Sequence, residues 1–341
     1  MDKYPPNKSQ KSPQPNLEGQ RILITGGLGF VGSNLARRCL EMGAQVSIFD
    51  NLDSHSGGNF YNILGIQNSV ELHYHDILDF DRMVEHVVGK DIIFNCAAST
   101  SHPFSMREPW LDMDVNSRGV INLLEALRRF NPEAKFIHIG TSTQLGRLHY
   151  QPADEDHPEF PLDIYSANKS VSEKYVLIYA HAYHLRASVI RLSNVYGPRA
   201  SIHSPEFTFN NYFIGLALQG RNISIYGEGA QKRNLIYVDD AVEALVGTAL
   251  NNEMDGMTCF AVGDEHFSID EIAHTIVKVI VKGSVSHIPW PAERQATEVG
   301  DAILSNARIK KMLDWQPRQN FLSGMEKTRD YYLECLERYI K

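Results

Sequence analysis

A tyrosine, a lysine and a threonine are spaced so that they could move a proton to and from a hydroxyl group. Tyr165 and Lys169 form a Y-x-x-x-K pattern, and one helical turn places both on the same helix face. A nearby ammonium stabilises the phenolate and lowers a tyrosine pKa, which gives a base usable near neutral pH. Thr141 lies upstream, at the predicted end of a strand. The pattern alone is weak evidence, because Tyr4 and Lys8 repeat it without such a context.

A glycine-rich turn near the N-terminus provides that context. Residues 22–24 are an apolar run typical of a buried strand, and Gly26, Gly29 and Gly32 follow it before a helical pattern at 33–38. Glycine permits a tight turn and a close approach to a pyrophosphate, while a helix N-terminus favours its negative charge. A strand, three glycines and a helix in this order predict a dinucleotide site.

The next predicted strand, residues 45–49, ends at Asp50, 18 residues after Gly32. A carboxylate at this distance can accept hydrogen bonds from the adenosine ribose. It would repel a 2′-phosphate, so Asp50 favours NAD over NADP. The alternative is that Asp50 only caps the end of a strand.

Strands and helices alternate along the first half of the chain. The predicted strands are 70–74, 91–95 and 135–139, and the predicted helices are 80–88, 115–130 and 165–184. This alternation indicates an α/β fold with a Rossmann-type, doubly wound parallel sheet and right-handed crossovers. In such sheets ligands bind at the carboxyl ends of the strands, and Ala97 and Ala98 there leave room for one.

The C-terminal part predicts a smaller α/β substrate domain. Residues 223–229 resemble a strand, and Ser268 followed by Glu271 resembles a capping box before an apolar helix.

We therefore expect a disordered tail at 1–18 and two domains built from four segments. The cofactor-binding domain comprises 19–192 and 232–258, and the substrate domain comprises 193–231 and 259–341.

Composition excludes several classes of function. A net charge of -8 over 341 residues argues against a nucleic-acid binder. The sequence contains no run of about 18 apolar residues, which a membrane span would need, so we expect a soluble, cytoplasmic protein. The four cysteines are far apart, which predicts reduced thiols, and the 14 histidines show no ligand spacing, so we predict no metal.

Taken together, these residues resemble the extended short-chain dehydrogenase/reductase family, in particular its nucleotide-sugar epimerases and dehydratases. The resemblance covers nearly the whole chain after the tail. The matching motifs are TGGLGFVG (25–32), DNL (50–52), Asp76 with Ile77, CAAS (96–99), DVNSRGVINLLEA (114–126), Thr141, YSANK (165–169), RLSNVYGPR (191–199) and GEGAQKRNLIYVDD (227–240).

The resemblance implies an NAD site, with the glycines and Phe30 against the pyrophosphate, Asp50 at the adenosine ribose and Asp76 and Ile77 beside the adenine. It implies these cofactor-binding residues: Gly26, Gly29, Phe30, Gly32, Asp50, Asn51, Asp76, Ile77, Ala97, Ala98, Asn116, Tyr165 and Lys169.

The resemblance also implies the reacting groups and the substrate, a nucleotide-diphosphate sugar. Tyr165 is the expected base, Lys169 holds the nicotinamide ribose and Thr141 hydrogen-bonds the sugar hydroxyl. Asn194 would contact the substrate, and Arg233 and Arg294 would grip the diphosphate. In the alternative interpretation, Asn194 satisfies only loop backbone groups and Arg294 is only a solvated surface charge.

Departures from the family patterns narrow the reaction. Ser142 and Thr143 replace the Asp-Glu pair of the 4,6-dehydratases and the glutamate of the decarboxylases, so both reactions are disfavoured. Gln144 and Leu145 replace a usual Val-Tyr, and Asn234 replaces a usual Asp, and these changes could alter the sugar pocket.

Elimination leaves epimerisation through a transient keto-sugar, with carbon 4 as the first expectation. Alternatives are a carbon-2 epimerase, a 4-ketoreductase, and less favoured a dehydratase, a decarboxylase or a non-catalytic NAD-binding scaffold. A serine hydrolase is rejected because residues 140–144 lack the second glycine of G-x-S-x-G. The family resemblance implies a homodimer through helices 115–130 and 165–184, although the same apolar stripes could instead cover the sheet.

Overall fold

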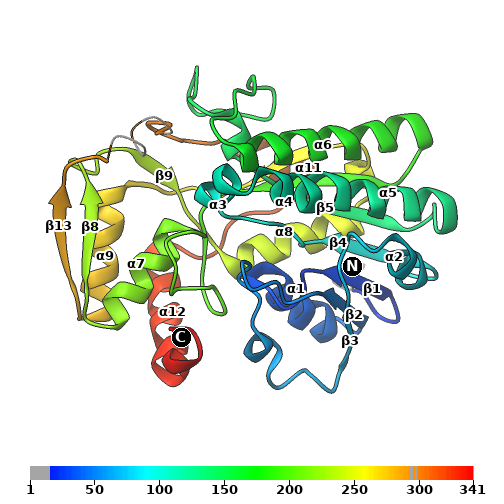
Figure 1. The fold of residues 1–341 in the computed structure, drawn as a ribbon, viewed down its shortest axis with the longest axis horizontal. Helices are drawn as coiled ribbons and strands as arrows, with labels where there is room; N and C mark the ends of the chain where they lie inside the picture. The colour runs from blue at the N-terminus through cyan, green and yellow to red at the C-terminus, as the bar shows by residue number, and fades with distance from the viewer. Residues whose placement is uncertain (1–15, 292–294, 296–297, 341) are drawn as a thin grey trace, which may run out of the picture.

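The computed structural model describes residues 16–291, 295 and 298–340. Its centre is a seven-stranded sheet with the order β11-β6-β5-β4-β1-β2-β3, in which every neighbouring pair is parallel (Figure 1). The strands are β1 (Arg21–Thr25), β2 (Gln45–Asp50), β3 (Val70–Tyr74), β4 (Ile92–Asn95), β5 (Lys135–Thr141), β6 (Ala187–Leu192) and β11 (Thr258–Ala261). The order reverses between β1 and β4, which confirms the predicted doubly wound sheet.

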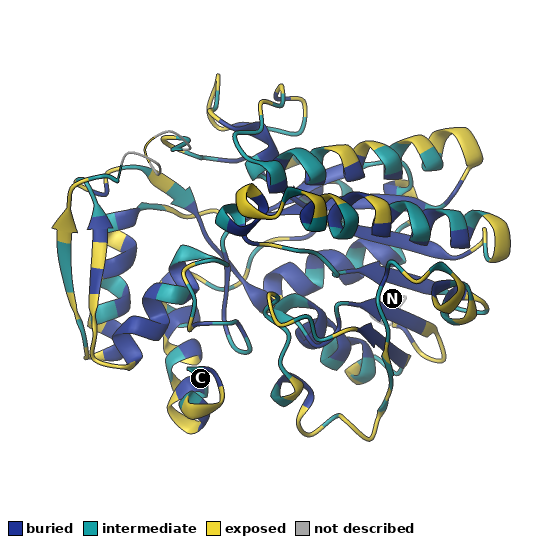
Figure 2. Cartoon of the chain, in the orientation of Figure 1, coloured by how far each residue is buried: buried dark blue, intermediate teal, exposed yellow. Residues whose placement is uncertain are grey.

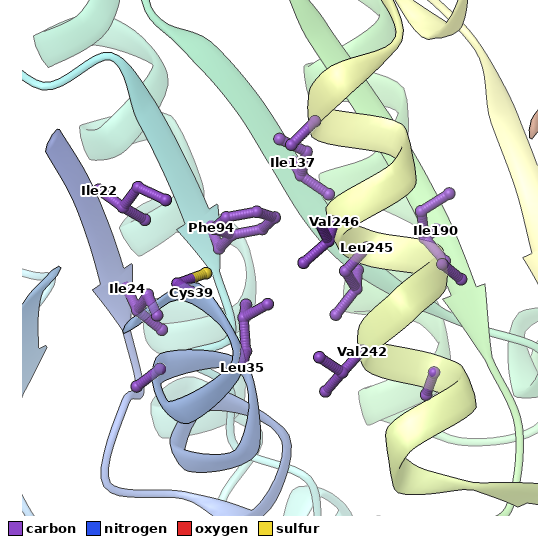
Figure 3. Close-up of a cluster of buried hydrophobic side chains, with 14 of the residues drawn as sticks. Ile22, Ile24, Leu35, Cys39, Phe94, Ile137, Ile190, Val242, Leu245 and Val246 are labelled. Carbon is purple, nitrogen blue, oxygen red and sulfur yellow. The ribbon is translucent and has the colours of Figure 1, made fainter. Parts of the chain in front are cut away.

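One face of the sheet is covered by α1 (Phe30–Glu41) and α8 (Val238–Leu250), with α11 (Ala307–Leu313) beside them. Figure 3 shows how Leu35 and Cys39 from α1 and Val242, Leu245 and Val246 from α8 point toward Ile22, Ile24, Phe94, Ile137 and Ile190 of the sheet. The side chains of this layer are almost wholly buried. Burying apolar surface in this way is the main term that holds the helices on the sheet.

The other face is covered by α2 (Phe80–Val87), α5 (Gly119–Phe130) and α6 (Ile164–Tyr183). The predicted helix 115–130 begins differently, because residues Asp114–Arg118 form a π-helical turn before α5. Leu123, Leu124 and Leu127 are buried against the sheet, so the apolar stripe predicted on this helix packs on the sheet. The outward faces of α5 and α6 alternate between half-buried and exposed residues (Figure 2).

A smaller lobe contains α7 (Phe209–Leu218), β8 (Asn222–Tyr226), α9 (Ile269–Ile280), β13 (Ser284–Ile288) and α12 (Phe321–Cys335), on the left of Figure 1. β8 confirms the predicted strand. The predicted capping box is present, since the Ser268 N–H donates to Glu271 Oε2 (2.8 Å) and the Glu271 N–H donates to Ser268 Oγ (3.1 Å).

Short elements join these helices and strands. They are η1 (Phe60–Ile63), α3 (His102–Arg107), α4 (Pro109–Met113), η3 (Thr143–Leu145), β7 (Val195–Tyr196), β9 (Lys232–Asn234), β10 (Ile236–Tyr237), η4 (Asn252–Met254), β12 (His266–Ser268) and η5 (Leu336–Arg338). β7 pairs with β10, and β9 pairs with β12.

The structure departs from some of the predicted segment boundaries. Residues 1–15 of the predicted tail lie outside the described part, but Leu17 is fully buried and its N–H donates to Met42 O (3.2 Å), so the packed chain starts earlier than predicted. β11 continues the sheet to Ala261, beyond the predicted segment end at residue 258. Trp315, from the predicted substrate domain, packs in the same core as α8. The assignment of the four segments to two domains stays a prediction.

Within the described ranges, no helix is long and apolar enough to cross a membrane. The four cysteines Cys39, Cys96, Cys259 and Cys335 are free thiols.

Candidate active site

A cavity of about 680 Å³ lies where the carboxyl ends of the central strands face the smaller lobe. Its wall brings together residues that are far apart in the chain. The predicted site residues that line it are Gly26, Gly29, Phe30, Gly32, Asp50, Asn51, Asp76, Ile77, Ala97, Ala98, Thr141, Tyr165, Lys169, Asn194 and Arg233.

The glycine turn between β1 and α1 is built for close backbone approach. Gly26 has a φ of +66°, and a Cβ there would lie 2.6 Å from Ala97 N. A Cβ at Gly32 would lie 2.3 Å from Gly26 O. Gly29 caps α1 without any side-chain hydrogen bond, and the first turn of α1 carries no acidic residue. The free N–H groups of α1 therefore fit a pyrophosphate.

Asp50 supports the same turn from the end of β2. One carboxylate oxygen accepts the Leu28 N–H (2.9 Å) and the other accepts the Leu52 N–H (2.8 Å). Burial raises the Asp50 pKa, and these two bonds oppose the rise. Asp50 thus caps the strand and also lines the cavity, so the two interpretations of this residue are compatible, and an ionised Asp50 disfavours a 2′-phosphate nearby.

Asn51, Asp76 and Ile77 form the far end of the cavity wall. Asn51 Nδ2 donates to Asp76 Oδ2 (2.9 Å), and the Leu78 N–H donates to Asp76 Oδ1 (2.9 Å). Ile77 is almost fully buried and fills the space above Gly119. These contacts leave an apolar wall beside polar oxygens, which fits a nucleoside.

Asn116 does not line the cavity, in contrast to the other predicted cofactor residues. It is buried in the π-helical turn, and its Nδ2 donates to Ser99 O (2.8 Å). Its support of the site is indirect, because it holds the loop that follows Ala97 and Ala98.

Thr141, at the end of β5, and Tyr165, in the first turn of α6, face the cavity. Thr141 Oγ1 lies 3.1 Å from Thr143 Oγ1, which also accepts a hydrogen bond from Ser166 Oγ (2.9 Å). Burial raises the pKa of Tyr165 above its ordinary value, although a hydrogen bond with Thr141 lowers it.

Burial of the phenol is the largest effect on the Tyr165 pKa, and the expectation that Lys169 lowers this pKa stays a prediction. Lys169 itself is 3% exposed, and burial lowers its pKa to about 8. Its ammonium donates to Ile139 O (2.6 Å) and lies 3.2 Å from His138 Nε2.

A buried polar chain links Lys169 to β1. His138 Nδ1 lies 3.0 Å from Asn95 Nδ2, and Thr25 Oγ1 donates to Asn95 Oδ1 (2.7 Å). Burial, together with the charge of Lys169, lowers the His138 pKa well below its usual range, so this imidazole is neutral. The chain holds the Lys169 ammonium through His138, which does not itself line the cavity.

Of the predicted substrate residues, Asn194 lies between β6 and β7, and Arg233 lies in β9. Asn194 has a φ of +45°, and its Nδ2 donates to Ser193 Oγ (2.9 Å) and Asn234 O (2.9 Å). Arg233 donates to Gly300 O (2.6 Å) and pairs with Glu298 (3.2 Å). Its guanidinium lies at the cavity wall but is engaged by a carboxylate. Arg294 lies outside the described residues.

The residue changes expected to alter the sugar pocket lie outside the cavity wall. Gln144 is fully buried and donates to Glu159 and Glu173, and Leu145 lies in a separate core cluster. Asn234 is buried and binds Gly263 O and the Leu304 N–H. None of these three lines the cavity, but Asn234 O accepts a hydrogen bond from the cavity-lining Asn194, so an effect on the sugar pocket stays a prediction.

Two polar residues that lie beside Tyr165 were not among the site residues predicted from the sequence. His102, the first residue of α3, and Asp163, the N-cap of α6, line the cavity and contact each other. Asp163 could have been found, because it directly precedes the predicted helix as a cap residue. His102 carries no comparable signal, because only the tertiary fold brings its loop to Tyr165.

A parallel sheet with a glycine turn after its first strand, and a Tyr-Lys pair facing its carboxyl edge, defines the short-chain dehydrogenase/reductase class. The family model described as GDP-mannose 4,6 dehydratase matches residues 23–328. The chain belongs to this family, within the extended short-chain dehydrogenases/reductases, as its sequence motifs predicted.

Relatives in this family differ in the reactions that their names give. A UDP-glucose 4-epimerase of Mycolicibacterium smegmatis is 32% identical over 319 residues, covering 92% of this chain and 98% of the relative. A UDP-glucuronic acid decarboxylase 1 of Danio rerio is 30% identical over 345 residues, covering 98% and 77%. Family membership therefore leaves the exact reaction open.

A solved relative holds the predicted cofactor. The UDP-glucose 4-epimerase of Thermus thermophilus, in complex with NAD, is 25% identical with a TM-score of 0.82, and the match covers 93% of this chain and 100% of that one. The prediction of NAD is thus confirmed at the level of the family.

Proposed function

We propose that this protein is an NAD-dependent epimerase of a nucleotide-diphosphate sugar, acting at carbon 4 through a transient keto-sugar. One observation carries the proposal. Thr141, Tyr165 and Lys169 line one cavity, whereas the two positions after Thr141 hold hydroxyl side chains in place of carboxylates. Elimination of water or carbon dioxide needs an acid at those positions in the dehydratases and decarboxylases that the sequence resembles, and epimerisation does not.

The residues divide the work as follows. Tyr165 accepts the proton of the sugar hydroxyl, and Thr141 hydrogen-bonds the same oxygen. Lys169 holds the nicotinamide ribose. Bound NAD would supply a hydride acceptor that returns the hydride to the opposite face of the same carbon. Tyr165 is only 8% exposed, so few water molecules can reach its hydroxyl group once a substrate fills the cavity.

The other predicted residues would bind the dinucleotide cofactor and the sugar nucleotide. The α1 N-terminus and Asp50 suit the dinucleotide, for the reasons of charge and hydrogen bonding given above. Asn194 and Arg233 would bind the sugar nucleotide, with Arg233 exchanging Glu298 for a phosphate. Arg294 remains a predicted second phosphate ligand.

A homodimer through the outer faces of α5 and α6 is part of the proposal. Ile178 and Tyr183 on α6 are 53% and 50% exposed, and Trp110 on the adjoining α4 is 76% exposed. Large exposed apolar side chains are common at protein interfaces. A second copy of this chain would cover them.

The test is a panel of UDP-, GDP-, CDP- and dTDP-sugars incubated with the protein and catalytic NAD, with products identified by NMR. A new epimer without net absorbance change at 340 nm is expected. Stoichiometric consumption of reduced cofactor by a 4-keto sugar would make the protein a ketoreductase instead, and inversion at carbon 2 would correct the site of reaction.

A further inference from the structure

A histidine-aspartate pair stands against the ring of Tyr165. The centroid of the His102 ring is 4.8 Å from that of Tyr165, and the two rings meet edge to face at 74°. His102 Nδ1 lies 2.8 Å from Asp163 Oδ2. His102 begins α3 and Asp163 caps α6, so two separate elements bring the pair to the wall of the cavity.

Asp163 is held in one orientation by its second oxygen. Asp163 Oδ1 accepts the Ser166 N–H (2.8 Å), which is the cap bond of α6. Burial would raise the Asp163 pKa, but the hydrogen bond and charge of His102 and the bonds from Ser166 lower it overall, so the residue is a carboxylate. A fixed carboxylate facing Nδ1 places the imidazole proton on Nδ1.

When the ring is neutral, the other ring nitrogen of His102, Nε2, is the proton acceptor. Within the part of the chain that the structure describes, the only side-chain hydrogen bond of His102 is the one from Nδ1. The side chain is 36% exposed, and the residue lines the cavity. Ser142 and Thr143, which also line the cavity, offer only hydroxyl groups. His102 therefore provides an imidazole nitrogen that can act as a base beside Tyr165.

We propose that His102, positioned by Asp163, is a second acid/base residue that exchanges a carbon-bound proton next to the sugar carbonyl. The C–H bond breaks, its proton goes to Nε2, and its electron pair moves into the carbonyl to give an enolate. The reverse transfer from N–H to carbon restores the ketone, so no oxidant or reductant is consumed. The inference rests on the proposed function only in placing the sugar beside Tyr165.

The experiment supplies the ketone ready-made, so that no hydride step is needed. The full-length protein is incubated in D₂O with UDP-, dTDP-, GDP- and CDP-4-keto-6-deoxyhexoses, and deuterium on carbons 3 and 5 is followed by NMR and mass spectrometry. We expect incorporation at one of these carbons well above the enzyme-free rate. His102→Gln should slow it about 10²-fold, the usual contribution of a general base.

Two further variants separate catalysis from folding. Asp163→Asn keeps an oxygen for the α6 cap but no longer fixes the imidazole proton on Nδ1, so exchange should slow while the melting temperature changes little. His274→Gln removes an exposed histidine that also pairs with an aspartate, Asp270; neither residue lines the cavity, and the variant should leave exchange unchanged.

Exchange that is equal in the wild type and His102→Gln, or no faster than without protein, overturns the proposal. The outcomes also separate it from the proposed function. Epimer formation without exchange would refute the role of His102 but support the proposed epimerase activity. Exchange without epimer formation would support the role of His102 but refute the epimerase activity.

Discussion

Lys169 should make the stability of this protein rise with pH in a way that a Lys169→Met variant does not share. Burial lowers its pKa from 10.5 to about 8 in the folded protein. Between these values the unfolded chain still holds a proton that the folded protein has released, so the free energy of unfolding increases with pH. Integrated from pH 7 to pH 10, this one group contributes about 2.5 kcal/mol.

The measurement is chemical denaturation of both proteins at pH 7, 8.5 and 10, followed by circular dichroism. All other titrating groups are shared, so the difference between wild type and Lys169→Met isolates the lysine. That difference should move in favour of the wild type by about 2.5 kcal/mol across the range. Lys278→Met, on the exposed face of α9, controls for the loss of a lysine side chain. Parallel curves for wild type and Lys169→Met would refute the claim that burial penalises this ammonium.

Three further perturbations test other parts of the site. Gly26→Ala places a Cβ 2.6 Å from a backbone atom, at a residue in the left-handed conformation. NAD binding, measured by calorimetry, should therefore be lost and the melting temperature should fall. Retained NAD affinity would contradict the requirement for a glycine in this turn. Glu298→Gln frees Arg233 from its carboxylate, so a nucleoside diphosphate should bind about two- to fivefold more tightly in a titration, and unchanged affinity would remove Arg233 from the diphosphate site. Trp110→Glu should shift the protein from dimer to monomer in light scattering, whereas a dimer that persists would place the interface elsewhere.

Local patterns in the sequence were sufficient to predict five of the seven strands, all but β6 and β11, and several residues that line the cavity. The apolar run at 22–24, the three glycines and Asp50 belong to one strand-turn-helix-strand unit, and their roles depend on near neighbours in the chain. The helix carrying Tyr165 and Lys169 was predicted for the same reason. The structure places it within one residue of the expected bounds at both ends.

Features that depend on distant contacts could not be predicted in this way. The Tyr165 pKa is raised mainly by burial, and the residues that surround Tyr165, such as His102 and Ser105, are distant in the chain, so no spacing in the sequence reveals it. Gln144 and Asn234 depart from the family patterns, yet they turn into the protein interior, because pairing with Glu173 and with Gly263 decides their direction. His138 alternates within a strand like any core residue, and only the fold places it behind Lys169.

The central claim is that one carbon of the sugar loses its hydrogen as a hydride and receives the same hydrogen on its other face. The direct measurement uses a nucleotide sugar that the protein turns over, labelled with deuterium on carbon 4, in ordinary water with catalytic NAD. The account predicts an epimer that keeps the label on carbon 4, with no reduced cofactor accumulating. Loss of the label to solvent, or label that collects in the cofactor pool, would contradict it.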